Sequence, residues 1–234
     1  MFEPWEEHFS KKYFTNKKNC DNSYLVSIDE AGRGSLFGPV TVGGILIPIN
    51  EIYSLTNIEW YNQIKDSKKL NISIREKLYS LINTKFNFAF SHISVKFIDT
   101  YNINRAIQYG IYRLIKQLSR QLNTTQNKDK ISFVLLDGKY NFSYPAVGMS
   151  DPMPVIFDLV NGDNLSFSIA CASIIAKVTR DKLMLKAAKR FPDYDLHKNM
   201  GYGTLSHRTA IKKLGCTTFH RKTFIKKIVK SDNL

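Results

Sequence analysis

Short apolar segments that end near a glycine, a proline or a carboxylate recur along this chain, and amphipathic segments separate them. Five segments have the length and the β-branched and aromatic content of strands: residues 24–28, 40–47, 86–95, 131–136 and 154–160. Three have apolar side chains at helical spacing: residues 71–83, 103–122 and 166–190. Asp99 or Thr100 is expected to cap the second of these helices. This alternation predicts an α/β fold with a mixed central sheet flanked by helices.

One strand is expected at the centre of the sheet. Residues 131–136 form an unbroken apolar run, which is typical of a parallel strand buried on both faces. A polar run that includes Lys17 and Asn22 precedes the first strand. We therefore expect a flexible N-terminal extension over residues 1–22, one domain over residues 23–228 that includes a small helical C-terminal region, and a tail over residues 229–234.

The charge of the chain suggests a polyanionic partner. Its 234 residues include 34 Lys and Arg against 20 Asp and Glu, a formal charge of +14. Nucleic acid is the first candidate and an anionic membrane surface the second, while a generally basic proteome is the alternative explanation. Three cysteines without metal-binding spacing indicate a reducing compartment. With no apolar signal sequence, and no apolar stretch as long as a membrane helix, we expect a soluble cytoplasmic protein.

Four acids stand close after predicted strands, where an open α/β sheet presents its ligand groups. Asp29 and Glu30 follow the first strand, Asp137 follows the fourth and Asp163 the fifth. If they converge, their mutual repulsion calls for a cation, and Mg²⁺ or Mn²⁺ prefers such oxygen ligands. Each acid taken alone also fits a turn or a cap. Asp181 is instead expected to form an exposed ion pair with Lys177, four residues earlier on a helix.

The segment from Ser27 to Val40, SIDEAGRGSLFGPV, closely resembles the opening motif of ribonuclease HII. Further segments resemble that family in order: Asp66 to Leu70 (DSKKL), Ile103 to Ala106, Leu135 to Gly138, Gly162-Asp163, Ala170 to Asp181, Gly201 to Thr204, His207 and His220-Arg221. The resemblance runs from about residue 24 to residue 224. So many segments in the same order make a chance match improbable.

The resemblance implies an RNase H-like catalytic domain that cuts RNA. Members of the family hydrolyse RNA in RNA–DNA hybrids and cut 5′ to single ribonucleotides in duplex DNA, leaving 3′-hydroxyl and 5′-phosphate ends. The resemblance implies that Asp29, Glu30, Asp137 and Asp163 are the catalytic residues and hold Mg²⁺ or Mn²⁺, two ions in the reacting complex. We expect a monomer with no membrane partner.

The resemblance also implies residues that bind the substrate. Gly32, Arg33 and Gly34, together with Tyr202, would read the junction from ribonucleotide to deoxyribonucleotide. The 2′-hydroxyl is the group that distinguishes RNA from DNA at such a site. Lys68 and Lys69 are expected to contact phosphates.

Other basic and imidazole side chains receive more general predictions. A wider electropositive face is expected from Arg180, Lys182, Lys186, Lys189, Arg190, Arg221, Lys222, Lys226 and Lys227. His207 and His220 are expected to orient loops, because their spacing is not that of metal ligands.

Three other interpretations fit the sequence less well. Gly32, Gly34 and Gly38 superficially resemble a dinucleotide-binding loop, but Pro39 leads into a strand rather than a helix. A non-catalytic nucleic-acid binder would gain nothing from four acids facing phosphates. The sister family, ribonuclease HIII, has an extra N-terminal domain, whereas about 22 residues precede the first predicted strand here.

Overall fold

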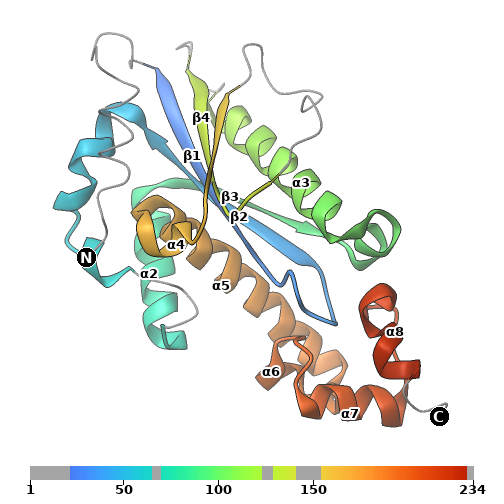
Figure 1. Cartoon of the computed structure of the whole chain (residues 1–234). Coiled ribbons are helices and arrows are strands. Elements are labelled where there is room, and N and C mark those ends of the chain that lie inside the picture. The colour runs from blue at the N-terminus through green and yellow to red at the C-terminus, as the bar shows by residue number, and fades with distance from the viewer. Residues whose placement is uncertain (1–21, 65–69, 123–128, 141–153, 231–234) are drawn as a thin grey trace.

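The computed structural model describes residues 22–64, 70–122, 129–140 and 154–230 (Figure 1). Its strands are β1 (Ser23–Ala31), β2 (Val40–Pro48), β3 (Asn87–Ile93), β4 (Lys130–Asp137) and β5 (Val155–Leu159). Its α-helices are α2 (Ile72–Lys85), α3 (Val95–Leu122), α4 (Gly162–Leu165), α5 (Phe167–Arg190), α6 (Leu196–Asn199), α7 (Leu205–Leu214) and α8 (Lys222–Lys230). Short 3₁₀ helices are η2 (Ile49–Asn57), η3 (Tyr61–Gln63) and η4 (Pro192–Tyr194).

The five strands form one mixed sheet in the order β3-β2-β1-β4-β5. β1, β2 and β3 are antiparallel neighbours, whereas β4 is parallel to both β1 and β5. The α/β class with a mixed sheet is therefore confirmed, and the apolar run of residues 131–136 does form a strand with parallel neighbours on both sides. This arrangement places the carboxyl ends of β1, β4 and β5 at one edge of the sheet.

Helices cover both faces of the sheet (Figure 1). Side chains alternate along β1, so Leu25 packs with α2 and α5 on one face and Val26 packs with α3 on the other. A Cβ at Gly43 of β2 would lie 2.5 Å from the backbone nitrogen of Ala176. Glycine at this position therefore lets α5 pack directly on the sheet. This close packing positions α5, the helix whose Ser173 donates a hydrogen bond to Asp29.

The start of α3 differs from the prediction. The helix begins at Val95, and Asn102, with φ of 70°, interrupts it after two turns. Asn102 Oδ1 then accepts a hydrogen bond from the amide of Arg105 and caps the remaining helix. Asp99 does not cap this helix; its carboxylate accepts from the amides of Lys222 and Thr223, so it caps α8 instead. A contact made 123 residues later in the chain thus decided the role of Asp99.

The other helix boundaries agree more closely with the sequence. Asn71 caps α2 through the amide of Ile74, and Ser166 caps α5 through the amide of Ile169. The predicted apolar face of α2 is only partly buried, because Ile74 is exposed. Among the described residues, no helix has both the length and the apolar content required to cross a bilayer.

The expected helical C-terminal region packs around its own apolar cluster. The cluster joins the loop after β1 to the end of α5 and the short helices that follow, with Leu36, Phe37, Met184, Tyr194, Leu196, Ile211 and Ile225 at its centre. α8 extends to Lys230, two residues beyond the predicted domain boundary. Of the predicted N-terminal extension, only Asn22 is described; its carbonyl accepts a hydrogen bond from the amide of Lys130 at 2.9 Å.

Candidate functional site

The carboxylates of Asp29 and Asp137 lie beside each other on two neighbouring parallel strands. β1 and β4 pair with Ile28 opposite Leu136, so the next residue of each strand is one of the two acids. Asp163 lies in α4, the helical turn that follows β5. One carboxylate oxygen from each of these three acids lies within 4.8 Å of the other two. The structure thus brings together three of the four acids that were predicted to converge.

Backbone amides orient two of these carboxylates. Asp29 Oδ1 accepts from the amide of Glu30 at 2.7 Å, and Asp137 Oδ1 accepts from the amide of Gly162 at 2.7 Å. Gly162 directly precedes Asp163, so the second bond also ties the turn of α4 to the end of β4. The cluster is therefore held together by the fold itself.

Burial and repulsion both act on Asp29. Its pKa is raised well above the usual value, first by desolvation and then by the charges of Glu30 and Asp137. Hydrogen bonds from Ser173 and from the Glu30 amide oppose these effects. A divalent cation would offset both the desolvation and the repulsion, and hard ions such as Mg²⁺ and Mn²⁺ take oxygen ligands. The three carboxylates therefore fit a divalent metal ion.

Glu30 is placed differently, because consecutive residues of a strand point to opposite faces of the sheet. Its carboxylate accepts a hydrogen bond from the hydroxyl of Tyr140, and Arg33 Nη1 lies 3.4 Å from its other oxygen. Among the described residues, the group of acids with oxygens close enough to share an ion does not include Glu30. Tyr140, whose pKa is raised by burial and by Glu30, was missed by the sequence reasoning.

The loop after β1 is built around glycine. Gly32 has φ of +86°, and a Cβ there would lie 1.9 Å from Arg180 Nε, so no other residue fits without displacing that side chain. Arg33 Nη2 donates to Asn104 Oδ1 at 2.6 Å and joins the loop to α3. A Cβ at Gly34 would meet nothing within 4 Å, so the backbone there is open to a ligand.

Two buried arginines hold this loop from inside. Arg180 and Arg221 are both 0% exposed. Arg180 donates to the carbonyls of Met200 and Phe37 at 2.8 and 3.2 Å, and Arg221 donates to the carbonyl of Arg33 at 2.8 Å. The prediction that they belong to an electropositive surface is therefore wrong. Burial lowers the pKa of both guanidinium groups, to about 9 for Arg221.

Arg180 lies on the same face of α5 as Ser173. It follows Ser173, the hydrogen-bond partner of Asp29, by seven residues, which is two helical turns. Six other members of the predicted electropositive face are exposed: Lys182, Lys186, Lys189, Arg190, Lys222 and Lys226.

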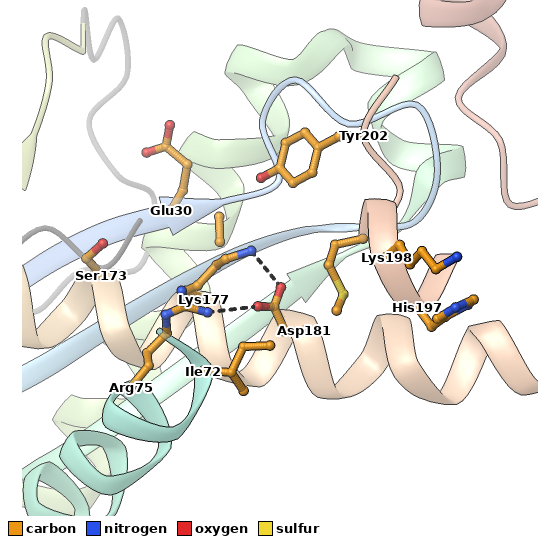
Figure 2. A pocket seen from close by; sticks show the side chains of 11 residues that line it. Glu30, Ile72, Arg75, Ser173, Lys177, Asp181, His197, Lys198 and Tyr202 are labelled. Atoms are coloured by element: carbon orange, nitrogen blue, oxygen red, sulfur yellow. Dashed lines mark hydrogen bonds and ion pairs between the residues drawn. The ribbon is translucent and has the colours of Figure 1, made fainter. Parts of the chain in front are cut away.

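A pocket of about 620 Å³ lies next to the acids, with Glu30 and Ser173 in its wall (Figure 2). Tyr202 also lines it, and the centre of its ring lies 5.8 Å from Lys177 Nζ. Tyr202 is half-buried, so one part of the ring remains accessible. Tyr202 and Glu30 therefore line one pocket, although 172 positions separate them in the sequence.

Asp181 forms the predicted ion pair, but inside this pocket rather than on an exposed face. Its carboxylate lies between two cations in Figure 2, at 2.8 Å from Lys177 Nζ and 3.4 Å from Arg75 Nη1. The side chain is 15% exposed. Arg75 was not predicted from the sequence to have a role, although it is the only buried charged residue of α2.

The lysines predicted to contact phosphates, Lys68 and Lys69, lie outside the described residues. The description resumes at Leu70, whose carbonyl accepts a hydrogen bond from Arg75 Nη2 at 2.7 Å. Arg75 also lines the pocket. The phosphate contacts of the two lysines stay a prediction.

The dinucleotide-binding interpretation is excluded by the element that follows the loop. Val40 begins β2, which pairs antiparallel with β1. A dinucleotide loop must instead open a helix, whose N-terminal amides bind the pyrophosphate.

A model of the family described as Ribonuclease HII matches residues 26–227, which include the three clustered acids, Glu30, the glycine loop and Tyr202. The chain belongs to the ribonuclease HII family. Members of this family are metal-dependent ribonucleases, so the chain is a hydrolase with RNase H activity on RNA–DNA hybrids.

Individual relatives agree with this membership. A Ribonuclease HII of Rickettsia bellii is 41% identical over 223 residues, which are 95% of this chain and 97% of the relative. The crystal structure of ribonuclease H2 from Pyrococcus horikoshii OT3 matches with a TM-score of 0.64 at 21% identity, over 90% of this chain and 99% of that one. A structure of Bst-RNase HIII in complex with Mn²⁺ matches with a TM-score of 0.56 at 16% identity, over 92% of this chain and 72% of that one. The RNase H-like fold is thereby confirmed.

Proposed function

We propose that this ribonuclease cuts the RNA strand of RNA–DNA hybrids and also cuts 5′ to single ribonucleotides embedded in duplex DNA. The proposed products are a 3′-hydroxyl and a 5′-phosphate. The observation that carries the proposal is the cluster of Asp29, Asp137 and Asp163, whose oxygens lie within 4.8 Å of one another next to a pocket lined by Tyr202. We further propose that the protein acts as a monomer in the cytoplasm.

The proposed metal ligands are Asp29, Asp137, Asp163 and Glu30, with Mg²⁺ or Mn²⁺ as the ions and two ions in the reacting complex. Bound divalent ions supply positive charge at the phosphate and lower the pKa of water so that it can attack. The Mn²⁺ complex of the structurally similar Bst-RNase HIII supports this choice of ion. Asp29 and Asp137 are the central ligands in this proposal, because they lie on paired strands and are oriented by backbone amides.

Glu30 has a separate role in the proposal. Its carboxylate is held by the Tyr140 hydroxyl and lies near Arg33, outside the group of three close carboxylates. From there it would order the attacking water, while Asp163 completes the ligand shell from α4. This division of work follows from the alternation of side chains along the strand.

Recognition of the ribonucleotide is assigned to the loop of Gly32, Arg33 and Gly34 and to Tyr202. The loop backbone is open at Gly34, so its amide and carbonyl groups could contact the 2′-hydroxyl. The ring of Tyr202 would stack on the next deoxyribose, where a 2′-hydroxyl would clash. Lys68 and Lys69 would contact phosphates from the segment before α2.

The test compares three labelled substrates: a DNA duplex with one ribonucleotide, an RNA–DNA hybrid and an all-DNA duplex. We expect cleavage of the first two with Mg²⁺ or Mn²⁺, none with EDTA, and none of the third. The cut in the first should lie 5′ to the ribonucleotide, and phosphatase and ligase treatment should identify the ends. Asp137→Asn should retain hybrid binding and lose turnover. Resistance of both ribonucleotide-containing substrates at saturating enzyme and metal would refute the proposal.

A further inference from the structure

Two buried histidines lie behind Tyr202 in the C-terminal region. His207 belongs to α7, and His220 lies two residues before the start of α8. Both are 0% exposed, and their Nε2 atoms are 3.2 Å apart. His207 Nδ1 lies 2.9 Å from the carbonyl oxygen of Tyr202, and His220 Nδ1 lies 2.9 Å from the amide nitrogen of Thr217.

The Thr217 amide fixes one arrangement of hydrogens on the neutral rings, and the Thr217 hydroxyl, 3.1 Å from His220 Nδ1, can rotate to donate to the same nitrogen. The Thr217 amide can only donate, so His220 Nδ1 accepts and the ring hydrogen of His220 is on Nε2. That hydrogen points at His207 Nε2, which accepts, so the hydrogen of His207 is on Nδ1. The Tyr202 carbonyl can only accept, so it receives this last hydrogen bond. The chain of bonds is complete from Thr217 to Tyr202.

Both rings are held in the neutral form that this arrangement requires. Burial lowers the pKa of His207, and burial together with the neighbouring imidazole lowers the pKa of His220 to about 4. An added proton would leave two donors facing each other, either between the rings or at Thr217. At neutral pH the pair therefore donates one fixed hydrogen bond to the Tyr202 backbone.

The backbone before Tyr202 is in a conformation that needs such support. Met200 has φ of 47° and Gly201 has φ of 82°, so two consecutive residues are in the left-handed region. The Tyr202 amide donates to the carbonyl of Asn199 at 2.9 Å. The Tyr202 carbonyl accepts from the amide of Thr204 at 2.8 Å as well as from His207.

The same pair contacts the loop on the other side of the pocket. The Phe37 ring packs edge-on against His220, with ring centres 5.0 Å apart, and the Phe37 amide donates to the carbonyl of Gly201 at 3.2 Å. Arg221, the next residue after His220, donates to the carbonyl of Arg33. The histidine pair thus lies where the loop after β1, which includes Arg33 and Phe37, meets the segment of Gly201 and Tyr202.

We propose that His207 and His220 form a positioning pair that sets the Tyr202 ring for recognition of the ribonucleotide–deoxyribonucleotide junction. The inference rests on the proposed role of Tyr202. The pair touches neither the acids nor the substrate; it acts through the one hydrogen bond to the Tyr202 carbonyl. Its loss should reduce cleavage at single ribonucleotides more than cleavage of continuous RNA, which offers many productive positions.

Two polar substitutions of His207 separate this role from a general structural one. His207→Asn places an amide donor where Nδ1 lies and keeps the bond to Tyr202, whereas His207→Gln extends its amide toward His220 and leaves the Tyr202 carbonyl without that donor. Ile211→Ala is the control for a general loss of stability, because Ile211 is a buried residue of α7, the helix of His207, and belongs to the apolar cluster of the C-terminal region. Each variant is assayed for kcat and KM on the single-ribonucleotide duplex and on the hybrid, and for its melting temperature.

We expect His207→Gln to lower the ratio of kcat/KM for the single-ribonucleotide duplex to that for the hybrid by about tenfold, the effect of about one hydrogen bond. His207→Asn should retain a ratio within about threefold of the wild type, and Ile211→Ala should leave the ratio unchanged while lowering the melting temperature. Equal ratios for the two His207 variants would overturn the inference and leave the proposed function intact. A wild-type protein that does not cut the single-ribonucleotide duplex would overturn both.

Discussion

Replacement of Arg180 by methionine tests whether a buried cation holds the pocket together. Its guanidinium group donates to four acceptors: the carbonyls of Pro39 and Phe37 at 3.2 Å, the carbonyl of Met200 at 2.8 Å and Ser35 Oγ at 2.9 Å. Methionine fills the volume of the aliphatic stem but donates to none of them. The substitution therefore leaves buried carbonyls without this donor at the junction between the loop after β1 and the segment before Tyr202.

The expected cost follows from these bonds. A hydrogen bond to a charged group contributes about 1.5 to 3 kcal/mol, so four would sum to roughly 6 to 12 kcal/mol. All four acceptors are neutral, and relief from the desolvation penalty of one buried charge, which is several kcal/mol, offsets about half of this sum. We expect a loss of about 3 to 5 kcal/mol in the free energy of unfolding. For a domain of this size that is a fall of roughly 6 to 20 °C in melting temperature.

The assay is thermal unfolding followed by circular dichroism, with Lys186→Met as the matched control. Lys186 is an exposed residue of the same helix, so its substitution also removes one positive charge and should change stability by no more than about 0.5 kcal/mol. Cleavage of both ribonucleotide-containing substrates should fall with Arg180→Met and remain with Lys186→Met. An Arg180→Met protein that melts within about 2 °C of the wild type would refute the reasoning, since the four bonds would then contribute nothing measurable.

Two further predictions concern charge. In EDTA, Asp29→Asn should raise the free energy of unfolding by about 1 to 2 kcal/mol, because it removes a buried charge that its neighbours repel. Saturating Mn²⁺ should stabilise the wild type and not the variant. Thermal melts with and without metal measure both effects, and a variant less stable than the wild type in EDTA would contradict the prediction. Acid should destabilise the protein through His220, whose folded pKa of about 4 lies below its ordinary 6.5, so that between these values the unfolded chain binds the proton and the folded chain does not. The loss grows as pH falls through this window to about 3 kcal/mol, at about 1.4 kcal/mol per pH unit. Urea melts of the wild type and His220→Gln at pH 7 and pH 4.5 measure it, and parallel pH dependence in the two would exclude His220 as the cause.

Local patterns in the sequence were sufficient for most of the elements. Residues 131–136 became β4, and the long periodic segment from residue 166 became α5, because strand length and helical spacing depend on neighbours within a few positions. The prediction that Asp99 caps the helix of residues 103–122 was wrong, because a cap depends on contacts with distant parts of the chain. A carboxylate can cap any free helix N-terminus that reaches it, and only the packed C-terminal region decides that this one belongs to α8.

The acid site also has one part that the sequence could predict and one part that only the structure showed. That Asp29, Asp137 and Asp163 converge could be anticipated, because each follows or ends a strand and parallel strands end at one edge of a sheet. That the Glu30 carboxylate lies outside the group of three close carboxylates could not be predicted from its adjacency to Asp29. It depended on β1 continuing through both acids to Ala31, so that alternation places them on opposite faces.

The amino-acid sequence by itself determined the α/β class, the family and the convergence of Asp29, Asp137 and Asp163, since motifs and periodicity are properties of short segments. Only the tertiary structure decided which basic and imidazole side chains are buried. Arg180 and the His207–His220 pair look like ordinary polar residues along the chain, and Arg180 reaches acceptors as far as 145 positions away. Their roles arise because buried donors must find acceptors wherever the fold brings them, and distance along the chain carries no information about that.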